Sequence, residues 1–299
     1  MRVVKHDEQT IEAADGTPLH VERWEPRGPV RFVVVIAHGG AEHVARYERL
    51  ARMFGEHGGL CFGPDHRGQG KSGGRPGHVA SFEQYADDLR RVIEGVAATL
   101  PAAERPDALP WFVFGHSMGG LITLTYLLDH ADAVPLRGVV LSSPLLEVAV
   151  KLGALKRGLA AVVTPIMPTL SVPAGIPPEH ICRDPDEVGR YERDPRRVRT
   201  FTVGWFAAMQ RASARVRAAF GSIEVPCLVY VGTGDLICNH RATMDVFAAQ
   251  PDAGARGHEL HCFDGYFHEL HNEPAELRAP VMELVEQWVL ARAGVQPDD

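Results

Sequence analysis

The sequence predicts a three-layer α/β domain with a mostly parallel central sheet. Three observations support this prediction. Continuous apolar and β-branched runs such as 31–37 (RFVVVIA) are typical of strands that are buried on both faces. Segments with helical periodicity, such as 82–100, separate these runs, and strands that alternate with helices form parallel βαβ units. Between 144 and 222 the alternation breaks, which indicates an insertion between two core strands.

The predicted elements follow one another in a regular order. The chain begins with a hairpin over 8–13 and 19–25, which turns at Asp15-Gly16. Further strands are expected at 31–37, 60–63, 111–114, 138–141, 226–232 and 258–263. Helices are expected at 47–57, 82–100, 118–130, 241–250 and 274–293. In such a sheet ligands bind at the carboxyl ends of the strands.

The insertion, residues 145–222, is expected to form a helical cap over that edge, after the sixth strand. Residues 1–144 and 223–299 would then form the core domain. The insertion is helical in character but is interrupted by Pro165, Pro168, Pro173, Pro177 and Pro178. Its first part, 148–170, allows two interpretations: a helix packed on the main domain, or a lid that touches lipid aggregates with a face carrying Lys151, Lys156 and Arg157.

Composition excludes several classes of function. The chain has 299 residues, 45% of them hydrophobic, and a net charge of −7, with scattered cations that offer no field for nucleic acid or an anionic bilayer. Five cysteines without a CxxC pair argue against a disulfide framework and a structural zinc site. No signal-peptide core or membrane-spanning run is visible, so we expect a cytoplasmic protein, with peripheral membrane contact through the cap as the alternative.

The strongest motif is WFVFGHSMGG at 111–120. Its Gly115-x-Ser117-x-Gly119 core lies between a predicted strand and a predicted helix, which is the context of a nucleophile elbow. Small residues on both sides allow the strand and the helix to approach, and the helix N-terminus favours negative charge near the serine. We therefore predict Ser117 as the nucleophile of a serine hydrolase with the α/β-hydrolase fold.

A serine hydroxyl needs a base that accepts its proton. In this fold class an acid and then a histidine follow the serine along the chain. Asp235 ends the buried run VYVGTGD and is our predicted acid, whereas Asp264 is expected to cap or face solvent. His268 is the predicted base because it comes first after the last strand, and His271 competes with it. A metal site on the two histidines is a further alternative, although no third ligand is obvious.

Acyl transfer also needs N–H donors for the developing oxyanion, each worth about 3–4 kcal/mol. We predict the backbone amides of Met118 and Gly40, the latter in the HGG loop after 31–37. His38 is expected to hold this loop by hydrogen bonds. The polar run 65–72 (DHRGQGKS) is interpreted as a hydrogen-bonded turn in which Asp65 pairs with backbone and with Arg67, and it lacks the P-loop pattern.

At these motifs the sequence resembles the monoacylglycerol lipase and lysophospholipase branch of the α/β-hydrolases, among the serine aminopeptidase S33-like hydrolases. The shared motifs include HGGAEH, RYERLA, DHRGQGKSGG, GHSMGG, GTGD and YFHELHNEP, in this order over nearly the whole chain. The resemblance implies an acyl-chain tunnel and a polar pocket for glycerol, ringed by Glu42, Arg46, Tyr191 and His271. One departure is Gly40, which stands where the family often has a larger residue and would loosen that loop.

The sequence therefore predicts a serine esterase that cleaves monoacylglycerols through an acyl-enzyme, without a metal or an organic cofactor. Apolar residues of the cap favour a lipid acyl chain: Leu145, Leu146, Leu152, Ile166, Met167 and Leu170. A lysophospholipase, or a broad carboxylesterase or thioesterase, would use the same triad and stays open. A binding protein without catalysis would be expected to lack part of the triad.

Overall fold

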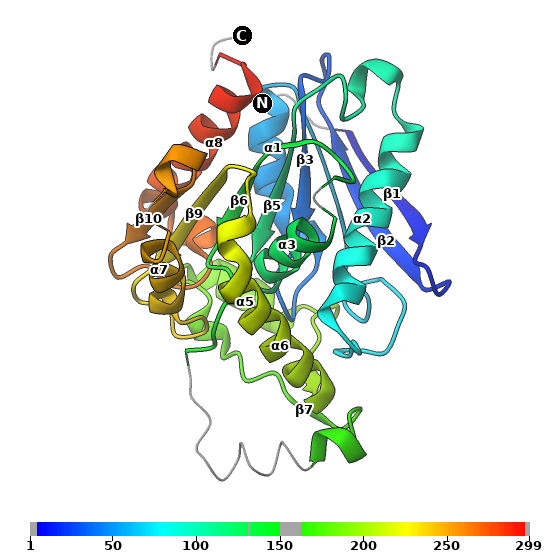
Figure 1. Ribbon diagram of the computed structural model, residues 1–299, viewed down its shortest axis with the longest axis vertical. Helices are drawn as coiled ribbons and strands as arrows, with labels where there is room; N and C mark the ends of the chain where they lie inside the picture. Colours follow the sequence, from blue (N-terminus) through cyan, green and yellow to red (C-terminus); the bar gives the residue numbers. More distant parts are fainter. Residues whose placement is uncertain (1–4, 131, 150–162, 251, 297–299) are drawn as a thin grey trace.

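An eight-stranded sheet with strand order β1-β2-β4-β3-β5-β6-β9-β10 runs through the middle of the molecule (Figure 1). This computed structural model describes residues 5–130, 132–149, 163–250 and 252–296. β1 (Lys5–Glu12) and β2 (Pro18–Glu25) form the antiparallel hairpin, and β2 also pairs antiparallel with β4 (Gly59–Pro64). The other neighbouring strands of this sheet are parallel.

The other elements confirm the predicted α/β class, and each lies within a few residues of its expected bounds. The remaining strands of the sheet are β3 (Phe32–Ala37), β5 (Trp111–His116), β6 (Leu136–Ser142), β9 (Cys227–Gly232) and β10 (Glu259–Phe263). The helices that the sequence predicted around it are α1 (Glu48–Glu56), α2 (Phe82–Thr99), α3 (Met118–Asp129), α7 (His240–Ala248) and α8 (Ala275–Ala293).

The two faces of the sheet are covered by different helices. Every residue of β3 is buried, and its side chains alternate between the two cores because successive residues of a strand point to opposite faces. Val33 and Val35 pack with residues of α2 and α3, whereas Val34 and Ile36 pack with residues of α1 and α8. The six consecutive apolar residues of β3 are therefore explained by burial of the strand on both faces of the sheet.

The strand order places the candidate catalytic loops side by side. The chain passes from β3 to its neighbour β4 and then crosses back to β5 on the other side of β3. This reversal is a topological switch point, and the loops that leave β3 and β5 diverge there and open a crevice. The HGG loop follows β3 and Ser117 follows β5, so both lie at this point.

The insertion between β6 and β9 differs in part from the helical cap that we expected. It contains α5 (Pro185–Arg193) and α6 (Val203–Ala219), but also a two-stranded antiparallel sheet of β7 (Ser171–Pro173) and β8 (Thr200–Thr202). α6 packs on the core through Trp205, whose ring centroid lies 5.6 Å from that of Phe82 in α2. In Figure 1 the insertion lies at the end of the sheet away from both termini.

The two interpretations of 148–170 depend on residues that the structure does not describe. Lys151, Leu152, Lys156 and Arg157 fall in the range 150–162, which lies outside the described residues. Ile166, Met167 and Leu170 are exposed, whereas Leu145 and Leu146 are buried in the core. None of these five lines the cavity at Ser117, so the position of these side chains does not support the preference for a lipid acyl chain that we based on them.

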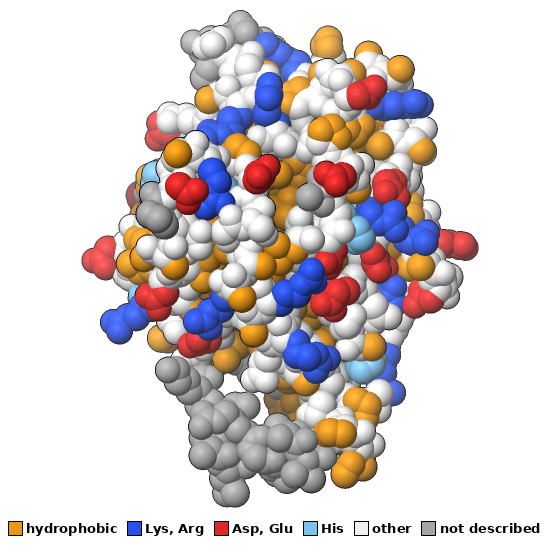
Figure 2. Space-filling view, viewed as in Figure 1, with side chains coloured by type: hydrophobic (Ala, Val, Ile, Leu, Met, Phe, Trp, Pro, Cys, Tyr) orange, Lys and Arg blue, Asp and Glu red, His pale blue; other side chains and the backbone are white. Residues whose placement is uncertain are grey.

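The visible surface agrees with the scattered charge of the sequence. In Figure 2 basic and acidic side chains are interspersed on this face, with no large area of a single sign. Within the described ranges, no helix has both the length and the apolar character needed to cross a bilayer.

We expect Gly119→Ala to destabilise the protein by about 1–3 kcal/mol or more, as overpacking does. A Cβ atom at this position would lie 1.9 Å from the carbonyl oxygen of Ala37 at the end of β3. Urea unfolding measures the change, and Gly28→Ala is the matched control because its Cβ atom would meet nothing within 4 Å. Equal stability of the two variants would contradict the close approach of α3 and β3.

Candidate active site

Ser117 lies in the turn between β5 and α3, where the sequence analysis placed it. Its φ of 51° and ψ of −115° fall in a region that residues with a side chain rarely occupy, and such strain costs about 1–3 kcal/mol. Close packing maintains this conformation. A Cβ atom at Gly115 would lie 2.6 Å from Thr123 Oγ1, and Gly119 is packed on the backbone of Ala37. Glycine at both flanks is therefore required.

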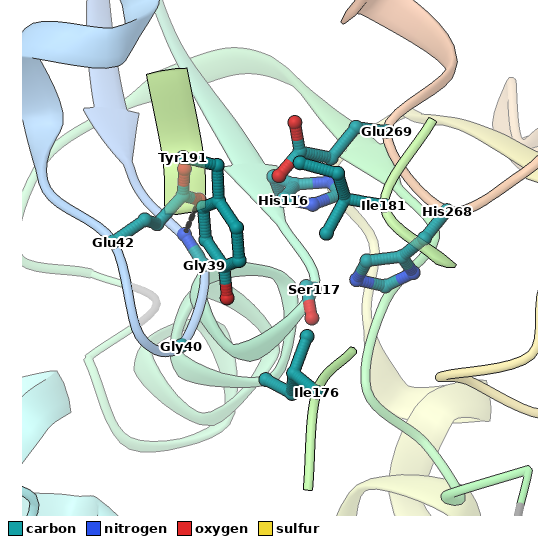
Figure 3. Close-up of a pocket in the computed structure, with 10 residues that line it drawn as sticks. All are labelled: Gly39, Gly40, Glu42, His116, Ser117, Ile176, Ile181, Tyr191, His268 and Glu269. Carbon is teal, nitrogen blue, oxygen red and sulfur yellow. Dashed lines mark hydrogen bonds between the residues drawn. The ribbon is translucent and has the colours of Figure 1, made fainter. Parts of the chain in front are cut away.

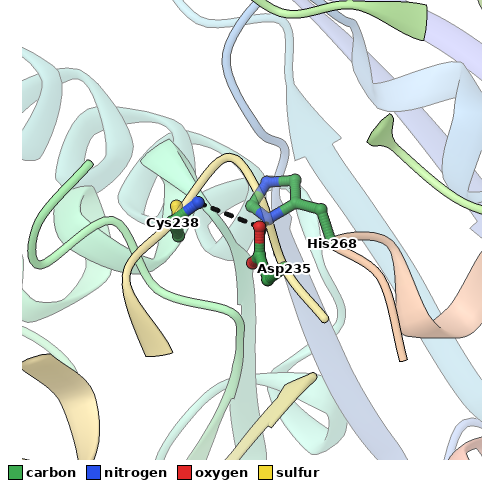
Figure 4. Close-up of side chains that lie close together, drawn as sticks. All are labelled: Asp235, Cys238 and His268. Carbon is green, nitrogen blue, oxygen red and sulfur yellow. Dashed lines mark hydrogen bonds and ion pairs between the residues drawn. The ribbon is translucent and has the colours of Figure 1, made fainter. Parts of the chain in front are cut away.

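Asp235 and His268 form a buried pair at the ends of β9 and β10. His268 Nδ1 lies 2.7 Å from Asp235 Oδ2, and both side chains are at most 5% exposed. The other carboxylate oxygen, Oδ1, accepts the backbone N–H group of Ile237 at 2.7 Å. It also accepts the N–H group of Cys238 at 2.9 Å, which Figure 4 shows. These bonds fix the carboxylate, which in turn orients the imidazole. Asp264 is exposed and accepts a hydrogen bond from Thr233, as expected of a residue outside the site.

Ser117 and His268 line the same cavity, and Figure 3 shows both side chains directed into it. The serine hydroxyl is not hydrogen-bonded to the imidazole within the described residues. Its Oγ atom lies 3.9 Å from Cys238 Sγ instead. The structure thus brings the three predicted triad residues to one site, without the hydrogen bond between Ser117 and His268. Catalytic hydrogen bonds are often long or poorly aligned in the absence of substrate and become short when it binds.

The surroundings of His268 raise its pKa. Burial is the largest single effect and opposes protonation of the imidazole, but the charge and hydrogen bond of Asp235, together with the charges of Glu269 and Glu42, outweigh it. The cationic form that a general base must reach during the reaction is therefore stabilised.

His271 is buried beside His116, with their ring centroids 5.0 Å apart, and it is not among the residues that line the cavity. Burial lowers the pKa of His271 to about 4, so this side chain is neutral at pH 7. Its Nδ1 atom has no hydrogen-bond partner within the described residues. The geometry favours His268 over His271 as the base.

Two groups of side chains in the described part of the chain are spaced closely enough to hold a metal ion. One consists of Asp235, Cys238 and His268, and the other of His6, Glu8 and Glu22 on the β1–β2 hairpin. Neither contains both histidines of the alternative that the sequence left open. In the first group burial raises the pKa of the Cys238 thiol well above its usual range, which opposes the thiolate that a metal would need.

The predicted oxyanion donors lie next to each other. A Cβ atom on Gly40 would be 3.8 Å from Met118 Cβ, so the HGG loop passes close to the first turn of α3. The first amides of a helix have no partner inside it, which leaves the Met118 N–H available. The Gly40 N–H likewise has no acceptor among the described residues. The same Cβ atom would meet Phe201 at 3.4 Å, so a larger residue has limited room here.

A buried charged cluster closes one end of the site. Arg46 Nη1 donates to Glu42 at 2.5 Å, and Arg46 forms two bonds of 2.7 Å with Glu269. The Tyr47 hydroxyl donates to Glu42 at 2.7 Å. Burial would raise the pKa of Glu269, but Arg46 overrides it and lowers that pKa to about 2. Burial raises the pKa of Glu42, which shares the same guanidinium.

The residues that the resemblance assigned to a polar pocket occupy different positions. Glu42 and Tyr191 line the cavity, whereas Arg46 and His271 do not. Arg46 instead lies behind the lining, with its guanidinium 5.0 Å from the ring centroid of Tyr191. Tyr191 projects from α5 toward the HGG loop (Figure 3).

The cavity at Ser117 is much smaller than the acyl-chain tunnel that the resemblance implies. The cavity at Ser117 measures about 10 Å³, which is room for about one water molecule. Three residues of the insertion, Ile176, Ile181 and Tyr191, close it against the core (Figure 3). The acyl chain of a lipid does not fit into this space, so the cavity must widen before such a chain can bind.

The polar turn 65–72 and the residue His38 have structural roles. His38 Nε2 accepts the His66 N–H at 2.9 Å, which holds the loop as expected. Asp65 accepts the backbone N–H groups of Val44 and Lys71, also as expected. The predicted Asp65–Arg67 pair was wrong. Arg67 forms its ion pairs with Asp88 and Asp15, because α2 and the hairpin turn bring carboxylates closer to the guanidinium.

Several residues at the site were missed by the sequence analysis. Glu269 lines the cavity beside His268, and Gln69 accepts the Ala41 N–H at 2.8 Å. Ser143, with a φ of 43°, donates its hydroxyl to the carbonyl oxygen of His268 at 3.0 Å. The adjacency of Glu269 to the predicted base was a usable signal, whereas the partners of Gln69 and Ser143 lie far away in the sequence.

Known proteins resemble this chain in sequence and in fold. Residues 28–275 match the family model of serine aminopeptidase, S33. Human monoglyceride lipase is 30% identical over 283 residues, which cover 94% of this chain and 89% of that relative. The phospholipase YtpA of Bacillus subtilis is 30% identical over 254 residues, which cover 84% of this chain and 92% of that protein.

A solved structure extends the comparison. The crystal structure of the monoacylglycerol lipase from Paleococcus ferrophilus has a TM-score of 0.79 and 28% sequence identity to this chain. The match covers 92% of this chain and 99% of that structure. The chain therefore belongs to the serine aminopeptidase S33 family, in the monoglyceride lipase branch of the α/β-hydrolase superfamily.

Proposed function

We propose that this protein is a serine ester hydrolase that cleaves monoacylglycerols to a fatty acid and glycerol. The observation that carries the proposal is the convergence of Ser117, His268 and Asp235 on one closed cavity. The names of the human and Paleococcus relatives support the substrate class. In this proposal residues 145–222 act as a cap over a core of residues 1–144 and 223–299.

The acylation step uses groups that are already in place. After rotation of its side chain, Ser117 transfers its proton to Nε2 of His268 and attacks the ester carbonyl carbon. Asp235 holds the other ring nitrogen and stabilises the imidazolium. The backbone N–H groups of Gly40 and Met118 stabilise the oxyanion, and His268 then returns the proton to the departing glycerol oxygen.

Deacylation repeats the same chemistry with water. Water gives a proton to His268 and attacks the carbonyl carbon of the acyl-enzyme. As the tetrahedral intermediate collapses, His268 returns this proton to Ser117 Oγ, the acyl–oxygen bond breaks, and the fatty acid is released. In this proposal the cap moves before a lipid enters, because Ile176 and Ile181 line a cavity with room for only about one water molecule. Only side chains, backbone amides and water take part in these steps.

The charged cluster favours a neutral leaving group over a phosphodiester. The Arg46 guanidinium is paired with two carboxylates, Glu42 and Glu269, and so offers no free positive charge to a phosphate. A glycerol hydroxyl can donate to the carboxylate oxygens that line the cavity, whereas a phosphate would meet like charge. The relationship to the B. subtilis phospholipase makes a lysophospholipid the second candidate substrate.

We expect kcat/KM for ester hydrolysis to fall at acid pH with a midpoint above 6.5, the ordinary imidazole pKa. The base must be neutral to accept the serine proton. Because the pKa of His268 is raised, a larger fraction is protonated at a given pH, and activity is lost earlier as the pH decreases. Initial rates with a soluble p-nitrophenyl ester measure the profile. A midpoint below pH 6 would contradict His268 as the base.

We expect Ser117→Ala to lower kcat by up to about 10⁶-fold and to abolish labelling by a fluorophosphonate probe. Ser222→Ala is the matched control, because this exposed hydroxyl bonds only to the carbonyl of Ala219. Circular dichroism checks that both variants remain folded. Undiminished turnover by purified Ser117→Ala protein would refute the proposed function.

We expect kcat/KM for a 1-monoacylglycerol to exceed that for a lysophosphatidylglycerol of the same acyl length by at least about 100-fold. Burying an uncompensated charge costs about 3–5 kcal/mol, and about 1.4 kcal/mol corresponds to a factor of ten. Release of fatty acid from each substrate in matched detergent micelles measures the ratio. Equal rates would show that the cluster does not select the headgroup and would favour the lysophospholipase alternative.

A further inference from the structure

The backbone N–H groups of Gly39, Gly40 and Ala41, in the loop after β3, differ in their hydrogen-bond partners. The Gly39 N–H donates to Glu42 Oε1 at 2.5 Å, and the Ala41 N–H donates to Gln69 Oε1 at 2.8 Å. The Gly40 N–H between them has no acceptor among the described residues. Two buried side chains thus hold the neighbouring amides and leave only the middle one for an incoming oxyanion.

The loop needs such support because its backbone is strained. Ala41 has a φ of 62°, a left-handed conformation that alanine rarely adopts. A non-glycine residue in this region costs about 1 kcal/mol or more and persists only when its surroundings enforce it. The hydrogen bond from the Ala41 amide to Gln69 supplies one such constraint.

Gln69 also contacts the other predicted oxyanion donor. Its Nε2 atom lies 3.4 Å from Met118 Sδ, while its Oε1 atom binds Ala41. Gln69 is 1% exposed, so water does not compete for these contacts. One side-chain amide therefore bridges the HGG loop and the first residue of α3.

Glu42 connects the same loop to the segment that carries the base. Its carboxylate binds the Gly39 amide on one side and Arg46 on the other. The Arg46 guanidinium forms two hydrogen bonds with the carboxylate of Glu269, the residue that follows His268. Asn272 Nδ2 donates to Glu269 at 2.8 Å and completes the support. The connection is buried, because Glu42 and Glu269 are each 3% exposed.

We propose that Gln69 and Glu42 are positioning residues that orient the Gly40 amide toward the oxyanion, and that the Arg46–Glu269 ion pair couples this loop to His268. The proposal rests on the ester hydrolase function proposed above. Negative charge develops on the carbonyl oxygen only in the transition state. Loss of the orientation therefore lowers kcat with little change in KM, whereas loss of a substrate contact raises KM.

The first experiment replaces Gln69 by Met and by Asn. Met has a similar length and no acceptor, and Asn keeps the amide but withdraws it by one carbon–carbon bond. We expect each variant to lower kcat about 10- to 100-fold, less than the 10²- to 10³-fold loss of a whole donor, with KM within threefold of wild type. Lys71→Met is the matched control, because the ammonium of Lys71 in the same turn bonds only to the exposed Glu8.

A trifluoromethyl ketone with an acyl chain provides a readout that a general loss of stability would not produce. The Ser117 oxygen adds to the ketone carbonyl carbon, and the resulting tetrahedral oxyanion accepts hydrogen bonds from the same N–H donors. We expect its inhibition constant to rise by the same factor as kcat/KM falls, with the concentration of folded sites counted by fluorophosphonate titration. A Gln69 variant with unchanged kcat, or with raised KM at unchanged kcat, would overturn the proposal while Ser117→Ala stays inactive.

The second experiment tests the coupling to His268 through Glu269→Gln. The groups around the imidazole that carry or acquire charge are Asp235, Cys238, His116, His271, Arg46, Glu42 and Glu269. Removal of one negative charge lowers the pKa of His268, so the acid limb of kcat/KM moves to lower pH and kcat falls. We expect Gln69→Met to leave the acid limb of the kcat/KM profile at the same pH as in the wild-type protein. If Glu269→Gln kept both the wild-type midpoint of the kcat/KM profile and the wild-type kcat, the proposed coupling to His268 would be refuted.

Discussion

The close approach of α3 to the end of β3 is the constraint on which the site depends. Gly119 packs on the backbone of Ala37 and His38, and this contact has no room for a side chain. The approach sets Ser117 in its strained turn and places the first amide of the helix beside the HGG loop. The nucleophile and both oxyanion donors therefore derive from one packing contact between a helix and two strands.

The second layer of organisation is electrostatic. Glu42, Arg46 and Glu269 form a desolvated cluster that stays intact because each charge has a partner, and a buried carboxylate without one would be costly. The cluster joins the segments that follow β3 and β10, two strands that are separated in the sheet by β5, β6 and β9. It also places negative charge near the imidazole and thereby stabilises the ionised intermediate.

The sequence predicted most of the core because its signals are local. Strands buried on both faces, amphipathic helices and the Gly-x-Ser-x-Gly turn can each be recognised within a short window. The cap was predicted less well, since the strands β7 and β8 have only three residues each, too few to show a pattern, and β7 ends in Pro173. The Arg46–Glu269 pair joins residues 223 positions apart, and the true partners of Arg67 depend on how α2 docks. Such contacts depend on tertiary packing and cannot be recognised within a short stretch of sequence.

The water-sized space at Ser117 has a thermodynamic consequence for substrate affinity. If the competent, open conformation is a minor member of the ensemble, the apparent dissociation constant equals the intrinsic one divided by the open fraction. Each factor of ten by which closure is favoured weakens lipid binding tenfold without any change in the contacts of the bound state. Ile176 and Ile181, by which the insertion lines the cavity at Ser117, therefore affect substrate affinity through the free enzyme rather than through contacts in the complex.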